Sequence, residues 1–176
     1  MEKLLLYCTH GELLEEHWRK FDGIGKFILY EHSDKVKYSN PNSSHRMNGK
    51  VVASCECDLV EPFTTDYRMD KEQTMRISKD SCLTLNEMSD YENRGGNCRC
   101  LYGHHLKNVN VFYKPKELSD YGLKKAPQNM CYVYDENGNK CILLSVHPKP
   151  LSQILNGEKT IEVRRKILNA LKELIK

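Results

Sequence analysis

A short helix, a glycine stop and a charged strand follow one another within residues 143–166, and this order constrains the fold more than any other feature of the chain. Pro148 suits the first turn of a helix, and apolar residues recur at helical spacing over 151–155. Gly157 stands where a left-handed C-terminal cap is expected. The pattern predicts a helix of about two turns that ends at this glycine.

Beyond Gly157 the hydrophobic period changes from helical spacing to two, which is typical of a strand. Ile161 and Val163 point to one face, which we expect to join the core. The other face carries Thr160, Glu162 and Arg164. Lys159 stands at the start of the strand, beside the end of the helix. We therefore expect a lysine, a threonine, a carboxylate and a guanidinium close together, with Lys159 and Arg164 exposed to solvent.

The pattern in the rest of the chain predicts short strands and a few short helices. Alternation and turn residues predict strands at 3–8, 26–30, 50–60, 99–113, 130–134 and 140–146. Helices are predicted at 12–20, 84–91, 115–118 and, as an amphipathic C-terminal segment, 166–176. Polar loops are predicted at 32–49 and from about 61 to 79. Thr84 with Glu87 forms a capping-box pattern, and Asn137-Gly138 is a hairpin signal. These elements predict one α+β domain over residues 1–176.

The composition is that of a folded protein with a polar surface. Of the 176 residues, 39% are hydrophobic and 29% charged, and the mean hydropathy is −0.65. No apolar run approaches the ~20 residues of a membrane helix, and the N-terminus lacks the pattern of a secretory signal. We therefore expect a cytoplasmic protein without a membrane partner.

Eight cysteines raise the possibilities of disulfides, a metal site or a nucleophile. In a cytoplasmic chain the default is reduced, mostly buried thiols. Cys98-x-Cys100 followed by His104-His105 has zinc-ligand residue types, but zinc sites favour Cys-x2-Cys spacing, so no metal or other cofactor is expected. Cys82 at a helix start is a weaker candidate for a catalytic thiol because no base is assigned beside it.

Positive charge is concentrated at the C-terminal end of the chain. The net charge is +3, and residues 147–176 contain seven lysines and arginines against three glutamates. The remainder is close to neutral. A basic end on a neutral body favours a polyanionic partner.

The helix, Gly-x-Lys-Thr and strand order resembles the signature of the ASCH domain, a branch of the PUA-like superfamily. The matching positions are Gly157, Lys159, Thr160, Glu162, Arg164 and Arg165, preceded by a lead-in strand at 145–148. Blocks such as KLLLYCTHG, NGKVVASCECDLVE and LKNVNVFYKPKELSDY are similar to small phage and bacterial members. The resemblance implies a small mixed β-barrel with peripheral short helices. The family usually has this signature at the N-terminus, so the order here is permuted; alternatively, the chain is a truncated tandem whose open edge favours a homodimer.

In one bacterial branch of that family the domain is an amidohydrolase acting on acetylated cytidine. The resemblance would make Lys159 the base or activator. Glu162 occupies the position of that branch's nucleophilic threonine, and Asp80 is the only residue that could imitate its catalytic glutamate. A hydrolase acting on a modified nucleoside is therefore the alternative and not the leading hypothesis.

The leading hypothesis is a domain that binds RNA, a nucleotide or a modified nucleoside. Phosphates would be held by four basic residues with Thr160 beside them: Lys159, Arg164, Arg165 and Lys166. Glu162 would read an amino edge, and His105 would stack on a base with Tyr102 or Tyr132 nearby. Two alternatives remain open. The strand could be a solvated surface with Glu162 and Arg164 as an exposed pair, or the final helix could dock on another protein or a second copy of this chain.

Overall fold

The computed structural model describes residues 2–9, 13–14, 28–29, 49–66, 70–94, 100–167, 169–172 and 174–175. Its strands are β1 (Glu2–Cys8), β2 (Leu13–Leu14), β3 (Ile28–Leu29), β4 (Val51–Phe63), β5 (Leu101–Lys116), β6 (Met130–Tyr134), β7 (Lys140–Val146) and β8 (Ile161–Arg164). Its helices are α1 (Lys71–Ser81), α2 (Leu85–Asn93), η1 (Leu118–Tyr121), α3 (Pro148–Leu155) and α4 (Asn169–Lys172). The fold is α+β, as the sequence predicts.

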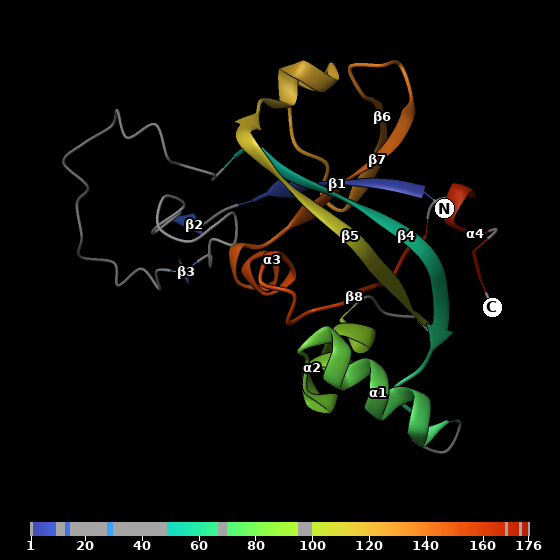
Figure 1. The fold of residues 1–176 in the computed structure, drawn as a ribbon. Coiled ribbons are helices and arrows are strands. Elements are labelled where there is room, and N and C mark those ends of the chain that lie inside the picture. The colour runs from blue at the N-terminus through green and yellow to red at the C-terminus, as the bar shows by residue number, and fades with distance from the viewer. Residues whose placement is uncertain are drawn as a thin grey trace.

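Six of the strands form one mixed sheet in the order β6-β7-β1-β4-β5-β8, and β2 pairs with β3 separately. β1 runs parallel to β7, whereas the other neighbours in the sheet are antiparallel. The register between β4 and β5 shifts at three places, and such irregularities bend a sheet. Figure 1 shows these two long strands curving across the molecule, with α1 and α2 at one end and the β6–β7 hairpin at the other.

Both faces of the sheet are covered. On one face, residues of β1, β4 and β7 pack against Leu151 and Ile154 of α3 and against Leu171 of α4. On the opposite face, Leu5, Val51 and Leu143 pack with Tyr121 of η1. The alternation of side chains along each strand assigns neighbouring residues to the two faces. The central strand β1 is therefore a continuous buried run, Leu4 to Cys8.

α1 and α2 form a helical pair between β4 and β5. Ile77 of α1 and Met88 of α2 pack on Ile161 and Val163 of β8, together with Leu101. Asp70 accepts the N–H of Gln73 at the start of α1, and the predicted Thr84–Glu87 capping box is present at the start of α2. This helical pair covers the outer face of β8 and forms a wall beside its edge.

The segment from about 61 to 79, which the sequence assigns to a loop, contains most of α1. α1 was missed because it has few apolar residues: its buried side chains are Thr74, Ile77 and Ser81, so no hydrophobic stripe marks it. The helix predicted to open at Pro115 is also wrong, because β5 continues to Lys116 and the helical turn starts at Leu118. Pro115 is tolerated since β8 pairs with β5 only over Tyr102–His105.

Among the described residues of the C-terminal segment 166–176, the helix α4 covers Asn169–Lys172. Its apolar residues pack as expected, since Leu171 is buried in the core and Ile167 and Leu174 lie against it. The backbone then turns toward β4, where Val60 donates its N–H to the Leu174 carbonyl at 2.9 Å. Pairing with the irregular part of β4 therefore ends the helix early.

The expected closed barrel is not observed, because the described strands form an open sheet with β6 and β8 at its edges. The helix predicted at 12–20 lies outside the described residues apart from Leu13–Leu14, which are extended. No helix in the described ranges is long and apolar enough to cross a membrane.

Candidate functional site

The turn between α3 and β8 determines where the side chains of the candidate site lie. α3 starts at Pro148 and Gly157 has a φ of +76°, so the glycine stop has the predicted left-handed conformation. The N–H groups of Glu158 and Lys159 then both donate to the Gln153 carbonyl, at 2.9 and 3.0 Å. The Thr160 N–H donates to the carbonyl of Asp80 in α1 at 2.9 Å. These bonds fix the direction in which β8 leaves the helix.

Lys159, Glu162 and Arg164 form a buried ion cluster, hereafter the charge triad. Lys159 Nζ lies 3.2 Å from Glu162 Oε2, and Arg164 Nη2 lies 2.8 Å from Glu162 Oε1. All three residues are buried, with Lys159 only 3% exposed. The expectation that Lys159 and Arg164 are exposed is therefore wrong. Two cations against one carboxylate leave the triad with a net charge of +1.

Backbone carbonyls compensate part of this excess positive charge. Lys159 Nζ donates to the carbonyl of Ser81 at 2.7 Å. Ser81 is the last residue of α1, and the carbonyls at a helix C-terminus carry the negative end of the helix dipole. An ammonium has three N–H donors, so its two contacts leave one for a bound molecule.

Arg164 also connects β8 to the other edge of the sheet. Its Nη2 donates to the Ser145 carbonyl in β7 at 2.6 Å, and its Nη1 donates to Asn129 Oδ1, just before β6, at 2.9 Å. β6 and β8 are the two edges of the sheet, so one guanidinium spans the opening between them. The bridge holds the site between strands that are not neighbours in the sheet.

Burial and charge act in opposite directions on Glu162. Burial alone would raise the pKa of this carboxyl group, but Arg164 and Lys159 outweigh it and hold the pKa below the ordinary value. Glu162 is therefore ionised at neutral pH.

His104 lies directly opposite Glu162 across the β5–β8 ladder. Burial lowers the pKa of His104, although its Nδ1 lies 3.2 Å from two backbone carbonyls, those of Tyr102 and Glu162. His104 is thus a neutral ring held beside the charge triad.

A pocket of about 510 Å³ opens over the charge triad. Its lining comes from three places: β8 and its preceding turn, α2, and the start of α3 with the loop before β6. Small-molecule sites in proteins usually enclose about 300–1,000 Å³. The pocket is thus large enough for a nucleoside or nucleotide.

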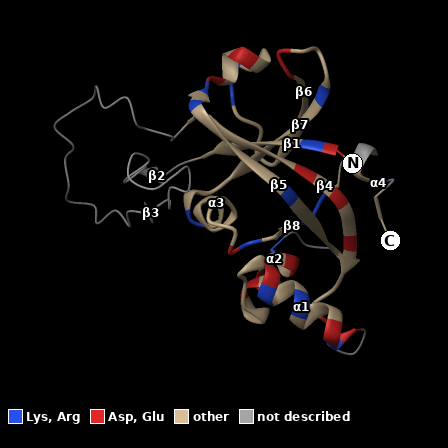
Figure 2. Ribbon diagram, viewed as in Figure 1, with Lys and Arg blue, Asp and Glu red and all other residues tan. Residues whose placement is uncertain are grey.

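One face of α2 forms a wall of this pocket. The lining residues of α2 and its C-cap are Glu87, Asp90, Tyr91 and Arg94. Arg165, which follows β8, places its guanidinium 5.0 Å from the centre of the Tyr91 ring. Figure 2 shows acidic and basic residues side by side on α1 and α2. The wall therefore offers an aromatic ring and two cations beside two carboxylates.

The predicted site residues are only partly brought together. Arg165 lines the pocket with the charge triad, whereas Thr160 is exposed at the turn and is not among the lining residues. His105 pairs with Ile161 and so points to the opposite face of the sheet from Glu162. There its Nε2 lies 2.5 Å from Glu61 Oε1. His105 therefore does not belong to the pocket.

The remaining candidates take structural positions. Asp80 contributes its backbone carbonyl to Thr160. Tyr132 and Tyr102 pack against the core on the α3 side of the sheet. Cys55 and Cys57 are buried free thiols, and burial raises the pKa of Cys57 to about 11. Within the described ranges, no group of three or more histidine, cysteine, aspartate or glutamate side chains is placed to hold a metal ion.

Sequence reasoning missed the α2 wall. Its lining residues are spaced by three, four and seven positions, which places them on one face of a helix. That spacing was visible in the sequence. What the sequence does not reveal is that this polar face turns toward the Gly-x-Lys-Thr strand and not toward open solvent.

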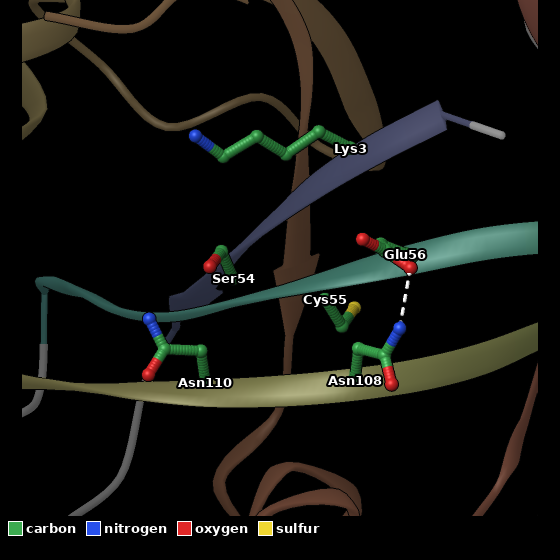
Figure 3. A pocket seen from close by; sticks show the side chains of 6 residues that line it. All are labelled: Lys3, Ser54, Cys55, Glu56, Asn108 and Asn110. Carbon is green, nitrogen blue, oxygen red and sulfur yellow. Dashed lines mark hydrogen bonds between the residues drawn. The ribbon is translucent and has the colours of Figure 1, made fainter.

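A second, smaller pocket of about 290 Å³ lies on the sheet, away from the charge triad. Figure 3 shows its polar side chains on β1, β4 and β5. Two of them are already engaged: Lys3 pairs with Asp135 at 2.8 Å, and Asn108 donates to Glu56 at 2.6 Å. The larger pocket, which has an excess of buried positive charge, is the stronger candidate for function.

Comparisons of the chain with models of protein families, with curated proteins and with solved structures found no match.

Proposed function

We propose that this protein binds a nucleotide or modified nucleoside, free or within RNA, in the pocket above the charge triad. The observation that carries the proposal is the net positive, buried floor of a pocket of about 510 Å³ with Tyr91 on its wall. A phosphate or carbonyl oxygen of the ligand complements the positive charge, and an aromatic ring offers a surface for a base.

We further propose that the chain is a permuted ASCH-type domain with a PUA-like, incompletely closed barrel. The curved β4–β5 pair and the Arg164 bridge between β8 and the β6–β7 side support this assignment. In such an arrangement side-chain hydrogen bonds take the place of the missing strand pairing between the two edges.

Binding is favoured over hydrolysis by the state of the charge triad. A general base near neutral pH works best with a pKa close to the ambient pH. The neighbouring cations hold the pKa of Glu162 below its ordinary value, which weakens it as a base. Lys159 Nζ is already engaged with the carboxylate of Glu162 and the carbonyl of Ser81, so it is held in the charge triad and is not free to activate a water molecule. Hydrolysis of an acetylated nucleoside remains the second candidate.

The proposal is tested by calorimetric titration with cytidine 5′-monophosphate, N4-acetylcytidine and a short single-stranded RNA. The informative variant is Arg94→Ala, since Arg94 is an exposed residue at the pocket wall. We expect it to weaken nucleotide binding about five- to tenfold, as for a charged hydrogen bond, with little change in stability. Lys114→Ala removes the same charge from an exposed position on β5 and is the matched control.

Equal affinities for the Arg94→Ala and Lys114→Ala variants would reject this pocket as the binding site. Absence of binding by all three compounds to the unmodified protein would reject the proposed function. Release of cytidine from N4-acetylcytidine, followed by chromatography, would favour the hydrolase instead.

A further inference from the structure

His147 occupies the end of the pocket where β7 gives way to α3. It is the N-cap residue of α3, it is exposed, and it is one of the pocket-lining residues. Its side chain makes no capping hydrogen bond to the helix. The ring is instead held from the other side, by the segment that follows β1.

The contact that holds the ring is made by Thr9. The Thr9 hydroxyl lies 3.2 Å from His147 Nδ1 and 3.2 Å from the carbonyl of Val146. A hydroxyl has a single proton to donate, and a carbonyl can only accept. When that proton goes to Val146, whose carbonyl also accepts the Thr9 N–H at 3.0 Å, the Thr9 oxygen accepts from His147 and Nδ1 carries the ring proton. In a neutral imidazole the other nitrogen, Nε2, is then a hydrogen-bond acceptor.

We propose that His147 is a recognition residue, whose Nε2 accepts an N–H or O–H of the bound molecule and whose tautomer is set by Thr9. This inference rests on the proposed function and narrows it, because it requires the ligand to present a donor at this end of the pocket. It also makes Thr9 a positioning residue that acts through His147.

The charged residues along α2 indicate where a charged group of the ligand binds in the pocket. Glu87 lies in the first turn of α2, where its carboxylate accepts the N–H and the hydroxyl of Thr84, both at 2.8 Å. Arg94 is seven residues further along and therefore about 10 Å away along the helix axis. Arg165 lies beside Tyr91, one turn before Arg94.

The ligand class follows from this polarity. The carboxylate of Glu87 disfavours a phosphate at the start of α2, whereas the cations Arg94 and Arg165 favour one at the other end of this helix. The separation of about 10 Å suits a molecule with a donor-bearing base at one end and a phosphate at the other. Together with the acceptor proposed at His147, these charges point to a nucleoside 5′-monophosphate whose phosphate lies at the Arg94 end of α2.

Calorimetric titration with cytidine and cytidine 5′-monophosphate tests both ends. We expect the monophosphate to bind about tenfold tighter than cytidine, and Arg94→Ala to remove that difference. Thr9→Val, which deletes the hydroxyl without changing the shape, should weaken both ligands about threefold, and His147→Leu about tenfold. Thr9→Ser keeps the hydroxyl and should restore most of the affinity. Equal binding by the unmodified, Thr9→Val and His147→Leu proteins would overturn the role of His147.

A measurement without ligand separates this inference from the proposed function. Nitrogen-15 chemical shifts of the His147 ring at neutral pH should report a proton on Nδ1 in the unmodified protein and a mixture of tautomers in Thr9→Val. A proton on Nε2 in the unmodified protein would overturn the inference even if nucleotides bind. Failure of both cytidine compounds to bind, with the proton on Nδ1, would instead overturn the ligand class while leaving the tautomer assignment standing. The proposed function itself fails only if N4-acetylcytidine and the RNA do not bind either.

Discussion

Two glutamates, Glu162 and Glu61, stand at the centres of ion clusters on opposite faces of the same part of the sheet. Glu162 contacts Lys159 and Arg164 on the α3 side. Glu61 contacts Arg76 and His105 on the other side. Each carboxylate lies between two basic side chains. In both cases the attraction of these partners outweighs the effect of burial, so the pKa of the glutamate is lowered. They differ in the surroundings of those partners.

The side chain of Lys159 is 2% exposed, whereas that of Arg76 is 43% exposed. Water therefore screens the cluster around Glu61 and leaves the cluster around Glu162 largely unscreened. Only the buried cluster lines the large pocket. The two clusters, although similar in composition, should therefore respond differently to mutation, and only the cluster around Glu162 is placed to contact a ligand.

Glu162→Gln should destabilise the protein most, because it leaves Lys159 and Arg164 buried without a carboxylate. Removing one partner of a buried ion pair typically costs about 3–5 kcal/mol, so we expect a loss of this size in the free energy of unfolding. Glu61→Gln is the matched control and should cost about 1 kcal/mol because its partners are screened. Urea denaturation followed by circular dichroism measures both. Equal losses would show that burial does not distinguish the two clusters.

A smaller effect is expected from acidification through His104. Its pKa is lowered in the folded protein from an ordinary value of about 6.5, so the unfolded chain takes up the proton first as the pH falls. Stability should therefore be complete above pH about 6.5 and decline below it, by at most about 1.4 kcal/mol per pH unit.

Substitution of His104→Gln should flatten this decline between about pH 6.5 and 5. His105→Gln is the corresponding variant on the other face. The measurement is the slope of the unfolding free energy against pH for each variant. A slope that is unchanged in His104→Gln would contradict the assignment of His104 as the buried neutral ring.

The smallest effect is expected at the surface pair of Lys107 with Asp58. The side chain of Lys107 is 60% exposed, and exposed ion pairs contribute about 0–1 kcal/mol. Lys107→Ala should therefore change the free energy of unfolding by less than about 1 kcal/mol. Thermal denaturation at low and high salt measures it, and a loss as large as that of Glu162→Gln would mean that exposure is a poor guide in this sheet.

Much of the fold could be predicted from local patterns. The strands β1, β4, β6 and β7 follow from alternation and turn residues, and α3 with its glycine stop follows from helical spacing and capping. These elements have strong local signals. α1 does not, because it buries a threonine, an isoleucine and a serine, and its fold depends on contacts with β8.

The charge triad was predicted as a set of residues but not as a buried cluster. Alternation in β8 correctly separates Ile161 and Val163 from Glu162 and Arg164, but it does not show which face is covered. Both faces of β8 are covered here. α1 and α2 cover one face, and β7 with the loop before β6, which Arg164 contacts, covers the other. His105 was misplaced because its face is set by its cross-strand pairing with Ile161, a long-range contact without a local signal.

The position of α1 and α2 between two long paired strands has an evolutionary consequence. β4 and β5 form a continuous stem, and the helical pair joins their ends. A change of length or sequence in residues 70–94 would remodel one wall of the pocket while the floor on β8 and the sheet stay intact. Evolution can therefore alter the ligand preference of such a domain by changing residues 70–94 alone, without changing the sheet.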